Sequence, residues 1–446
     1  MRRPLLLLLG LLLSCSACKK NDTTVSPQPA TRKAILLPVT EPAVPLTAPL
    51  FLSQPIPTTV IETTNEALPI WRSFAKNRPA LVIAANTPAV FSVPDEFQAE
   101  LDNLLKSADD QELLRRSSPD NPDPLFLPVM SLAVALDAGW FSQVVWIFPS
   151  KLTPEQLDLG IFKQQLVDAR IASPDEAESF TLNNGSFSGI VRGRPFTAAH
   201  AEALPPLDAS ALLHIDADYF KPLYAGEIKT PLYPLMVDLL NKIKERSWKI
   251  AAATVALSNR QFDGLPLQTR FLGKDLATIL QDPQMLEETF PHQWELRSNA
   301  LYLENFIQRE EIRHIYLEME KEDPGDPAVK FGLYHISRQL NKTDDALEYL
   351  REAVQLDKVY AGEYLSLSEL AMEKKRPEQA VKMLQLARSA QPENPFILLQ
   401  VVRALLNTGQ QEEAKALKPE LTALMWSKIY YPQQRDETAG LLSLLQ

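Results

Sequence analysis

Residues 212–220 read LLHIDADYF, an apolar run that ends in two carboxylates. Such a run predicts a strand buried on both faces, as in a parallel sheet that is covered by helices. Asp216 and Asp218 are two residues apart, so they share one face of an extended chain. Because open α/β sheets bind ligands beyond the carboxyl ends of their strands, the pair predicts a site at that edge. Two carboxylates there can hold a hard cation or take part in acid–base chemistry.

Similar strand-like runs alternate with helical stretches from residue 34 to about residue 320, which predicts an α/β domain over residues 34–322. The expected strands are 34–37, 59–62, 81–85, 144–148, 212–216 and 250–257. The expected helices are 95–106, 127–138, 154–168, 233–246 and 294–307. Residues 109–124 (DDQELLRRSSPDNPDP) interrupt the pattern with charge and proline, and they predict an exposed loop.

The last third of the chain carries a repeat. Alanines recur 34 residues apart at Ala346, Ala380 and Ala414, and leucines do so at Leu350 and Leu384. This resembles the tetratricopeptide repeat, a two-helix unit of that period with small residues where its helices cross. The resemblance implies a helical domain over residues 323–446, closed by capping helices, whose concave surface binds a protein or peptide partner. The alternative is that so short an array only buttresses the α/β domain.

The first 17 residues have a basic tip followed by a leucine run, which is typical of a secretory signal and is too short for the roughly 20 residues of a membrane span. The segment LLLSC resembles the lipobox of bacterial lipoproteins, which implies a lipid on Cys15, with Cys18 as the alternative. Residues 18–33 predict a flexible tether. We therefore expect an exported chain anchored in the membrane, at the outer membrane and facing the periplasm. A CxxC redox or metal pair is the other reading of CSAC.

Composition excludes several classes of function. The formal net charge of −11 opposes contact with phosphate backbones, so nucleic acid is not an expected partner. The chain has 14 glycines and neither of the glycine-rich motifs that cradle phosphates. Residues 185–189 (GSFSG) place Phe187 where a serine nucleophile would stand. No cofactor is expected, the alternative being a weakly bound divalent cation.

Four blocks carry a second resemblance, over residues 60–220. They are TNEALPIW at 64–71, the strand at 81–88, VVWIFP at 144–149, and LLHIDADYF. They follow one another as in an uncharacterised family of the arginase and histone deacetylase superfamily. That resemblance implies a parallel-sheet hydrolase of C–N bonds, amide or guanidino, with two metals. Its ligands would come from a histidine before Asn-Glu-Ala, a DxHxD strand end, and a later DxD.

Only the DxD is present, at Asp216 and Asp218. The other expected ligands fall on Thr64, Ala85, Thr87 and Ala89, none of which binds a divalent cation as carboxylate or imidazole does. We therefore expect a catalytically degenerate domain joined to partner-binding repeats.

The alternative is a hydrolase with a rearranged site around the pair, using residues such as Asn86, Asn259, Arg260 or Asp263. His214 is a further candidate in the crevice, although its place on an apolar strand favours a core histidine.

Overall fold

The computed structural model describes residues 46–227, 232–257, 266–288 and 290–446. The signal segment with Cys15 and Cys18, the tether and the expected strand 34–37 lie outside these ranges. So do three of the crevice candidates, Asn259, Arg260 and Asp263. Within the described ranges, no helix is both long enough and apolar enough to cross a membrane.

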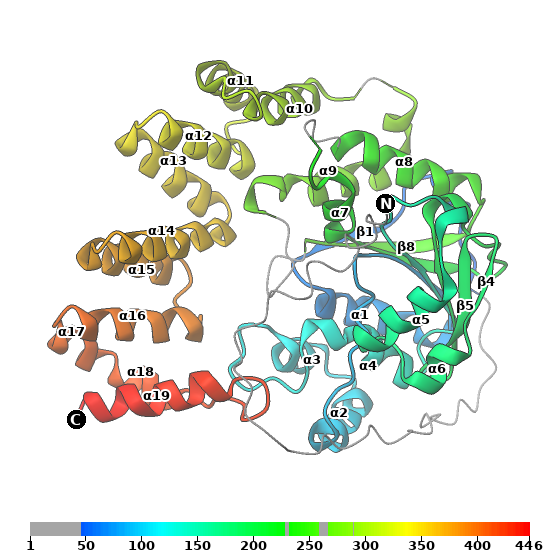
Figure 1. Cartoon of the computed structure of the whole chain (residues 1–446), viewed down its shortest axis with the longest axis horizontal. Coiled ribbons are helices and arrows are strands. Elements are labelled where there is room, and N and C mark those ends of the chain that lie inside the picture. Colours follow the sequence, from blue (N-terminus) through cyan, green and yellow to red (C-terminus); the bar gives the residue numbers. More distant parts are fainter. Residues whose placement is uncertain (1–45, 228–231, 258–265, 289) are drawn as a thin grey trace, which may run out of the picture.

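One eight-stranded sheet organises the first part of the chain, in the order β1-β8-β7-β2-β3-β6-β5-β4. Neighbours from β1 to β6 pair in parallel, whereas β5 and β4 are antiparallel additions at one edge. The strands are β1 Thr58–Ile61, β2 Ala80–Ala84, β3 Val144–Ile147, β4 Thr181–Asn183, β5 Ser186–Val191, β6 Arg194–Ala199, β7 Ala211–Asp216 and β8 Ile250–Ala256. This sheet and the helices that follow it confirm the predicted order of an α/β part and then a helical part (Figure 1).

Helices cover both faces of the sheet because its central strands are apolar on both sides. In β2, Leu81 and Ile83 join one core, and Val82 and Ala84 join the core on the opposite face. The surrounding helices are α1 Leu68–Ser73, α2 Asp95–Ser107, α3 Asp110–Ser117, α4 Ser131–Asp137, α5 Leu159–Asp168, α6 Pro174–Glu178, α7 Lys221–Tyr224, α8 Leu232–Glu245 and α9 Phe271–Gln281. Every residue of β2 and β7 is buried, as the apolar runs predict.

The expectation of a loop over residues 109–124 is wrong in its first half, where α3 forms. Asp109 caps this helix, because its carboxylate accepts a hydrogen bond from the backbone N–H of Glu112 at 3.0 Å. Leu113 and Ser117 on the inner side of the helix are fully buried. The charged residues that suggested a loop are the exposed face of an amphipathic helix.

Two expected helices have different starts. Residues 154–168 form a short 3-10 turn, Pro154–Gln156, and then α5. Residues 127–138 likewise begin with the 3-10 turn Pro128–Met130, and α4 follows it. In both places the proline fixes a tight first turn, and the α-helix begins after it.

The antiparallel edge of the sheet was not predicted. Asn184 and Gly185 have positive φ angles of 48° and 78° and form the turn between β4 and β5. Arg192 and Gly193, at 50° and 70°, form the turn between β5 and β6. Two-residue turns of this kind match the twist of a hairpin. The GSFSG segment is therefore the turn into β5 and the beginning of that strand, which pairs with both β4 and β6, and Phe187 lies in the core.

From residue 292 onwards the chain forms a series of packed helices, which we call the helical array. Its members are α10 His292–Glu304, α11 Arg309–Glu322, α12 Pro327–Gln339, α13 Thr343–Leu356, α14 Gly362–Glu373, α15 Pro377–Ala390, α16 Pro395–Asn407, α17 Gln411–Ala416, α18 Lys418–Ala423 and α19 Pro432–Leu444. The repeating alanines Ala346, Ala380 and Ala414 each stand fourth in the second helix of a pair, and all three are buried. Helices α10 and α11 precede the expected boundary at residue 323, yet they share one apolar core with α12.

Both ends of the helical array are attached to the α/β part (Figure 1). Near the first end, the 3-10 turn η7, Leu267–Thr269, packs against α12, the third helix of the array, and Leu267 packs against the core of the array. At the far end, the backbone N–H of Ser427 donates to the carbonyl of Pro122 at 2.8 Å, and the Tyr430 hydroxyl donates to the carbonyl of Leu125 at 3.0 Å. The Tyr430 ring also stacks on Phe97, with centroids 5.4 Å apart.

Candidate functional site

The sequence points to the carboxyl edge of the sheet, and the topology places a switch point there. β2 is followed by β3 on one side of it, whereas β7 is followed by β8 on the other side. Chain connections therefore leave the neighbouring strands β2 and β7 in opposite directions. In open α/β sheets this arrangement opens a crevice beyond the strand ends, where ligands bind.

Asp216 and Asp218 lie at this edge, and each is only 5% exposed. Asp216 ends β7, and Asp218 lies in the following 3-10 turn, η6 Ala217–Phe220. The backbone N–H of Asp218 donates to Oδ1 of Asp216 at 3.0 Å. The backbone N–H of Asn86, just beyond β2, donates to Oδ1 of Asp218 at 3.0 Å. The two carboxylates thus hold the turn after β7 and tie it to the end of β2.

The positions that the arginase-like resemblance assigns to metal ligands lie in the same region. Thr64 and Ala85 are buried, and Thr87 and Ala89 follow β2 beside Asn86. None of these side chains is a carboxylate or an imidazole. Among the described residues, the histidine and carboxylate side chains that gather in a group of three are elsewhere, and that group does not include Asp216 or Asp218.

His214 lies in the core beneath the edge and is fully buried. Its Nδ1 is 2.8 Å from the Thr254 hydroxyl oxygen, and its ring meets Trp71 edge to face with centroids 5.4 Å apart. Nε2 is buried and has no hydrogen-bond partner in the described part of the chain. Burial lowers the pKa of His214 to about 3, so the ring is neutral at physiological pH. Its position is that of a packing residue on one face of the sheet.

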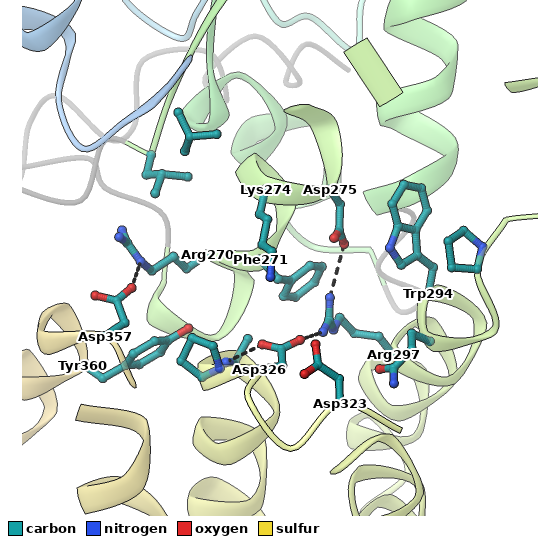
Figure 2. A pocket seen from close by; sticks show the side chains of 16 residues that line it. Arg270, Phe271, Lys274, Asp275, Trp294, Arg297, Asp323, Asp326, Asp357 and Tyr360 are labelled. Atoms are coloured by element: carbon teal, nitrogen blue, oxygen red, sulfur yellow. Dashed lines mark hydrogen bonds and ion pairs between the residues drawn. The ribbon is translucent and has the colours of Figure 1, made fainter. Parts of the chain in front are cut away.

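The structure also contains a cleft that the sequence did not predict, between α9 and α10 on one side and α12 with the 3-10 turn η9, Lys358–Ala361, on the other (Figure 2). Its volume is about 320 Å³. Phe271 and Trp294 form part of its wall, and two arginines cross it.

Arg270 and Arg297 connect the two walls of this cleft. Arg270 pairs with Glu62 at the end of β1, through Nη1 at 2.8 Å, and with Asp357 of the helical array, through Nε at 3.0 Å. Arg297 reaches Asp275 of α9 at 3.2 Å and Asp326, the residue that caps α12, at 2.5 Å (Figure 2).

Burial sets the electrostatics of these pairs. Desolvation acts to lower the pKa of Arg270, but the hydrogen bonds that Arg270 donates to Glu62 and Asp357, together with the negative charges of these carboxylates, outweigh it and raise that pKa overall. Desolvation raises the pKa of Asp275, against the lowering effect of Arg297. Each arginine is therefore paired with carboxylates of the chain itself. The ion pairs in the cleft connect the α/β part to the array, and we call them the charged joint. The paired residues are too far apart in the sequence to form a recognisable motif.

A third feature is an exposed group of metal-ligating side chains. His292 begins α10, and Glu318 and Glu322 lie near the end of α11. One ligand atom from each lies within 4.8 Å of the others. Nothing in the sequence singles out His292, because the two glutamates come close to it only through the pairing of α10 with α11.

Comparisons with known proteins add no family to these observations. A scan against models of protein families found no match for the chain, and a search of curated proteins found none either.

Proposed function

We propose that the chain is a membrane-anchored scaffold that binds a protein partner through its helical array, while the α/β part is a catalytically degenerate support. The observation that carries this proposal is the hydrogen bonding of Asp216 and Asp218. Both accept hydrogen bonds from backbone N–H groups, at the point where a binuclear hydrolase would direct them at metals. A metal that activates water must be held in fixed geometry by several ligands.

The resemblance to tetratricopeptide repeats supports the binding role of the array, because such stacks commonly take an extended peptide or a partner helix. Met372 of α14 is 43% exposed, which leaves a flexible apolar side chain on the surface of the array. Methionine adapts to irregular partner surfaces. The lipid on Cys15 would hold this surface beside the membrane, at the outer membrane and facing the periplasm.

Substitution of the carboxylate pair tests the degenerate role. Asp216→Asn together with Asp218→Asn keeps the acceptor oxygens of both hydrogen bonds, so the fold should remain intact and partner binding should be unchanged. Asp344→Asn with Asp345→Asn, at exposed positions of α13, is the matched control. If the wild-type chain hydrolyses amide or guanidino substrates in Mn²⁺ or Zn²⁺ and only the first pair abolishes this, the scaffold proposal fails.

Capture of partners from the native envelope tests the binding role. The anchored chain should retain a partner that Met372→Glu loses, because a charge there opposes apolar contact. Ser366→Glu, exposed on another face of α14, should retain it. Fatty-acid labelling of the same material should be lost in Cys15→Ala and kept in Cys18→Ala. Equal capture by the Met372 and Ser366 variants would remove α14 from the binding surface.

A further inference from the structure

The group at the α10–α11 pair has the chemistry of a metal site. The two helices pack against each other, which brings the first residue of α10 beside the last turns of α11. Nε2 of His292 is 3.7 Å from Oε1 of Glu318. Glu322 is four residues after Glu318, so it lies on the same face of α11 one turn later. Imidazole nitrogen and carboxylate oxygens are thus presented together from two helices.

The charges around His292 are poorly balanced without a cation. Glu318 and Glu322 are like charges at the i and i+4 positions, which destabilises a helix. They also lie near the carboxyl end of α11, where the helix dipole disfavours negative charge. Neither has a lysine or arginine partner among the described residues, whereas the neighbouring Glu320 pairs with Lys330 at 2.6 Å.

A third carboxylate lies on the other side of the imidazole. Oε2 of Glu295 is 3.8 Å from Nδ1 of His292, whereas Glu318 approaches the other ring nitrogen. In metal sites, a carboxylate at that nitrogen orients the ring and increases its basicity. The arrangement therefore places two potential ligands at Nε2 and an orienting group at Nδ1.

We propose that His292, Glu318 and Glu322 bind a zinc ion, with Glu295 as the positioning residue for the imidazole. Ligands at 2.0–2.2 Å from a tetrahedral zinc lie about 3.4 Å apart. The 3.7 Å between His292 and Glu318 is already close to that separation, and all three side chains are exposed. Three protein ligands leave a fourth position for water. The imidazole favours zinc over Mg²⁺ and Ca²⁺, which prefer oxygen ligands throughout.

The location gives this site a role that the proposed scaffold function does not require. α10 carries Arg297, which pairs with Asp275 of α9 and Asp326 before α12. α11 shares an apolar core with α12. A zinc ion that links α10 to α11 would stiffen the connection through which the array leaves the α/β part.

Titration calorimetry on the full exported chain, free of any histidine tag, tests the site. We expect one zinc ion per chain with no comparable heat from Mg²⁺, and a melting temperature that rises with zinc. Binding should weaken as the pH falls, because imidazole and carboxylates bind metal only when deprotonated. His292→Ala, and Glu318→Gln with Glu322→Gln, should abolish both the heat and the thermal shift. His314→Ala removes an exposed histidine of the same pair of helices and should change neither.

Two outcomes would overturn the proposal. Zinc that binds His292→Ala as it binds the wild type does not use this site. Zinc that is lost only in Asp216→Asn with Asp218→Asn occupies the crevice instead, which would count against the degenerate α/β domain as well. Loss at His292 with no change in the aspartate variant supports the new site and leaves the scaffold proposal untouched.

Discussion

His214 and Asp216 are both buried and lie two residues apart on β7, but only Asp216 lies at the crevice. His214 is enclosed by Trp71 and Thr254, and nothing in the described surroundings offers its Nε2 a hydrogen-bond partner. Protonation there would bury an uncompensated charge, which is why burial lowers the pKa of His214 to about 3.

This histidine should make the chain sensitive to acid. Its pKa is about 3 when folded and 6.5 in the reference state, so below pH 6.5 the unfolded chain binds a proton that the folded chain excludes. The contribution of neutral His214 to the free energy of unfolding is complete above pH 6.5. It is lost as the pH falls toward 3, by about 1.4 kcal/mol per pH unit. His214→Gln should therefore lose about 2 kcal/mol less than the wild type between pH 7 and pH 5. Urea unfolding at the two pH values measures this.

The exposed His314 provides the control, since His314→Gln should keep the pH dependence of the wild type. If His214→Gln also keeps it, the ring is protonated in the folded chain and the packing role is wrong.

At this scale the sequence placed Asp216 and Asp218 at a strand end but could not show how they are bonded. The donor to Asp218 is Asn86, which is 132 residues away in the sequence, and only the pairing of β2 with β7 brings it near. The arginines of the cleft were missed for the same reason, because Arg270 meets Glu62 across 208 residues.

Periodic features of single elements were predicted better than irregular ones. The apolar runs of β2, β3, β7 and β8 appear close to their expected bounds, since burial on both faces leaves few other structures for them. The antiparallel strands lack that signal, because β4 (TLN) has only three residues and β5 (SFSGIV) interrupts its apolar residues with Ser and Gly. The Asn184-Gly185 pair was the available clue, because Asn-Gly between two alternating runs is a strong hairpin signal.

The packing of the array is tested at α15. Ala380 is fully buried, so Ala380→Leu should overpack the contact with neighbouring helices and cost about 1–3 kcal/mol of stability. Gln379→Leu introduces leucine at the adjacent exposed position and should be nearly neutral. Thermal unfolding compares the two. An Ala380→Leu chain that melts with the wild type would contradict the assigned repeat.

On the scale of the whole molecule, the charged joint at the cleft decides how the two parts are coupled. Arg297 is only 4% exposed and serves Asp275 and Asp326 together. Arg297→Met should cost about 3–5 kcal/mol, because it leaves the buried Asp275 and the partly buried Asp326 without this cation. Adding Asp275→Asn should recover part of the loss, since one uncompensated charge is removed.

Denaturant unfolding of the two variants measures this coupling, with Arg309→Met at an exposed position of α11 as the control. A single variant as stable as the control would show that the joint contributes little. The α/β part and the helical array would then be stable independently of each other.

The attachment of the array at both ends has a consequence for how this chain can evolve. A free-standing stack of repeats gains or loses a unit easily, because each unit touches only its neighbours. Here η7 packs against α12 near the beginning of the array, and Ser427 and Tyr430 contact Phe97, Pro122 and Leu125 near its end. Deleting one 34-residue unit would leave Tyr430 unable to reach Phe97, and inserting one would push it past. The distance between these two attachments therefore fixes the number of repeats, and we expect that number to stay constant as the sequence diverges.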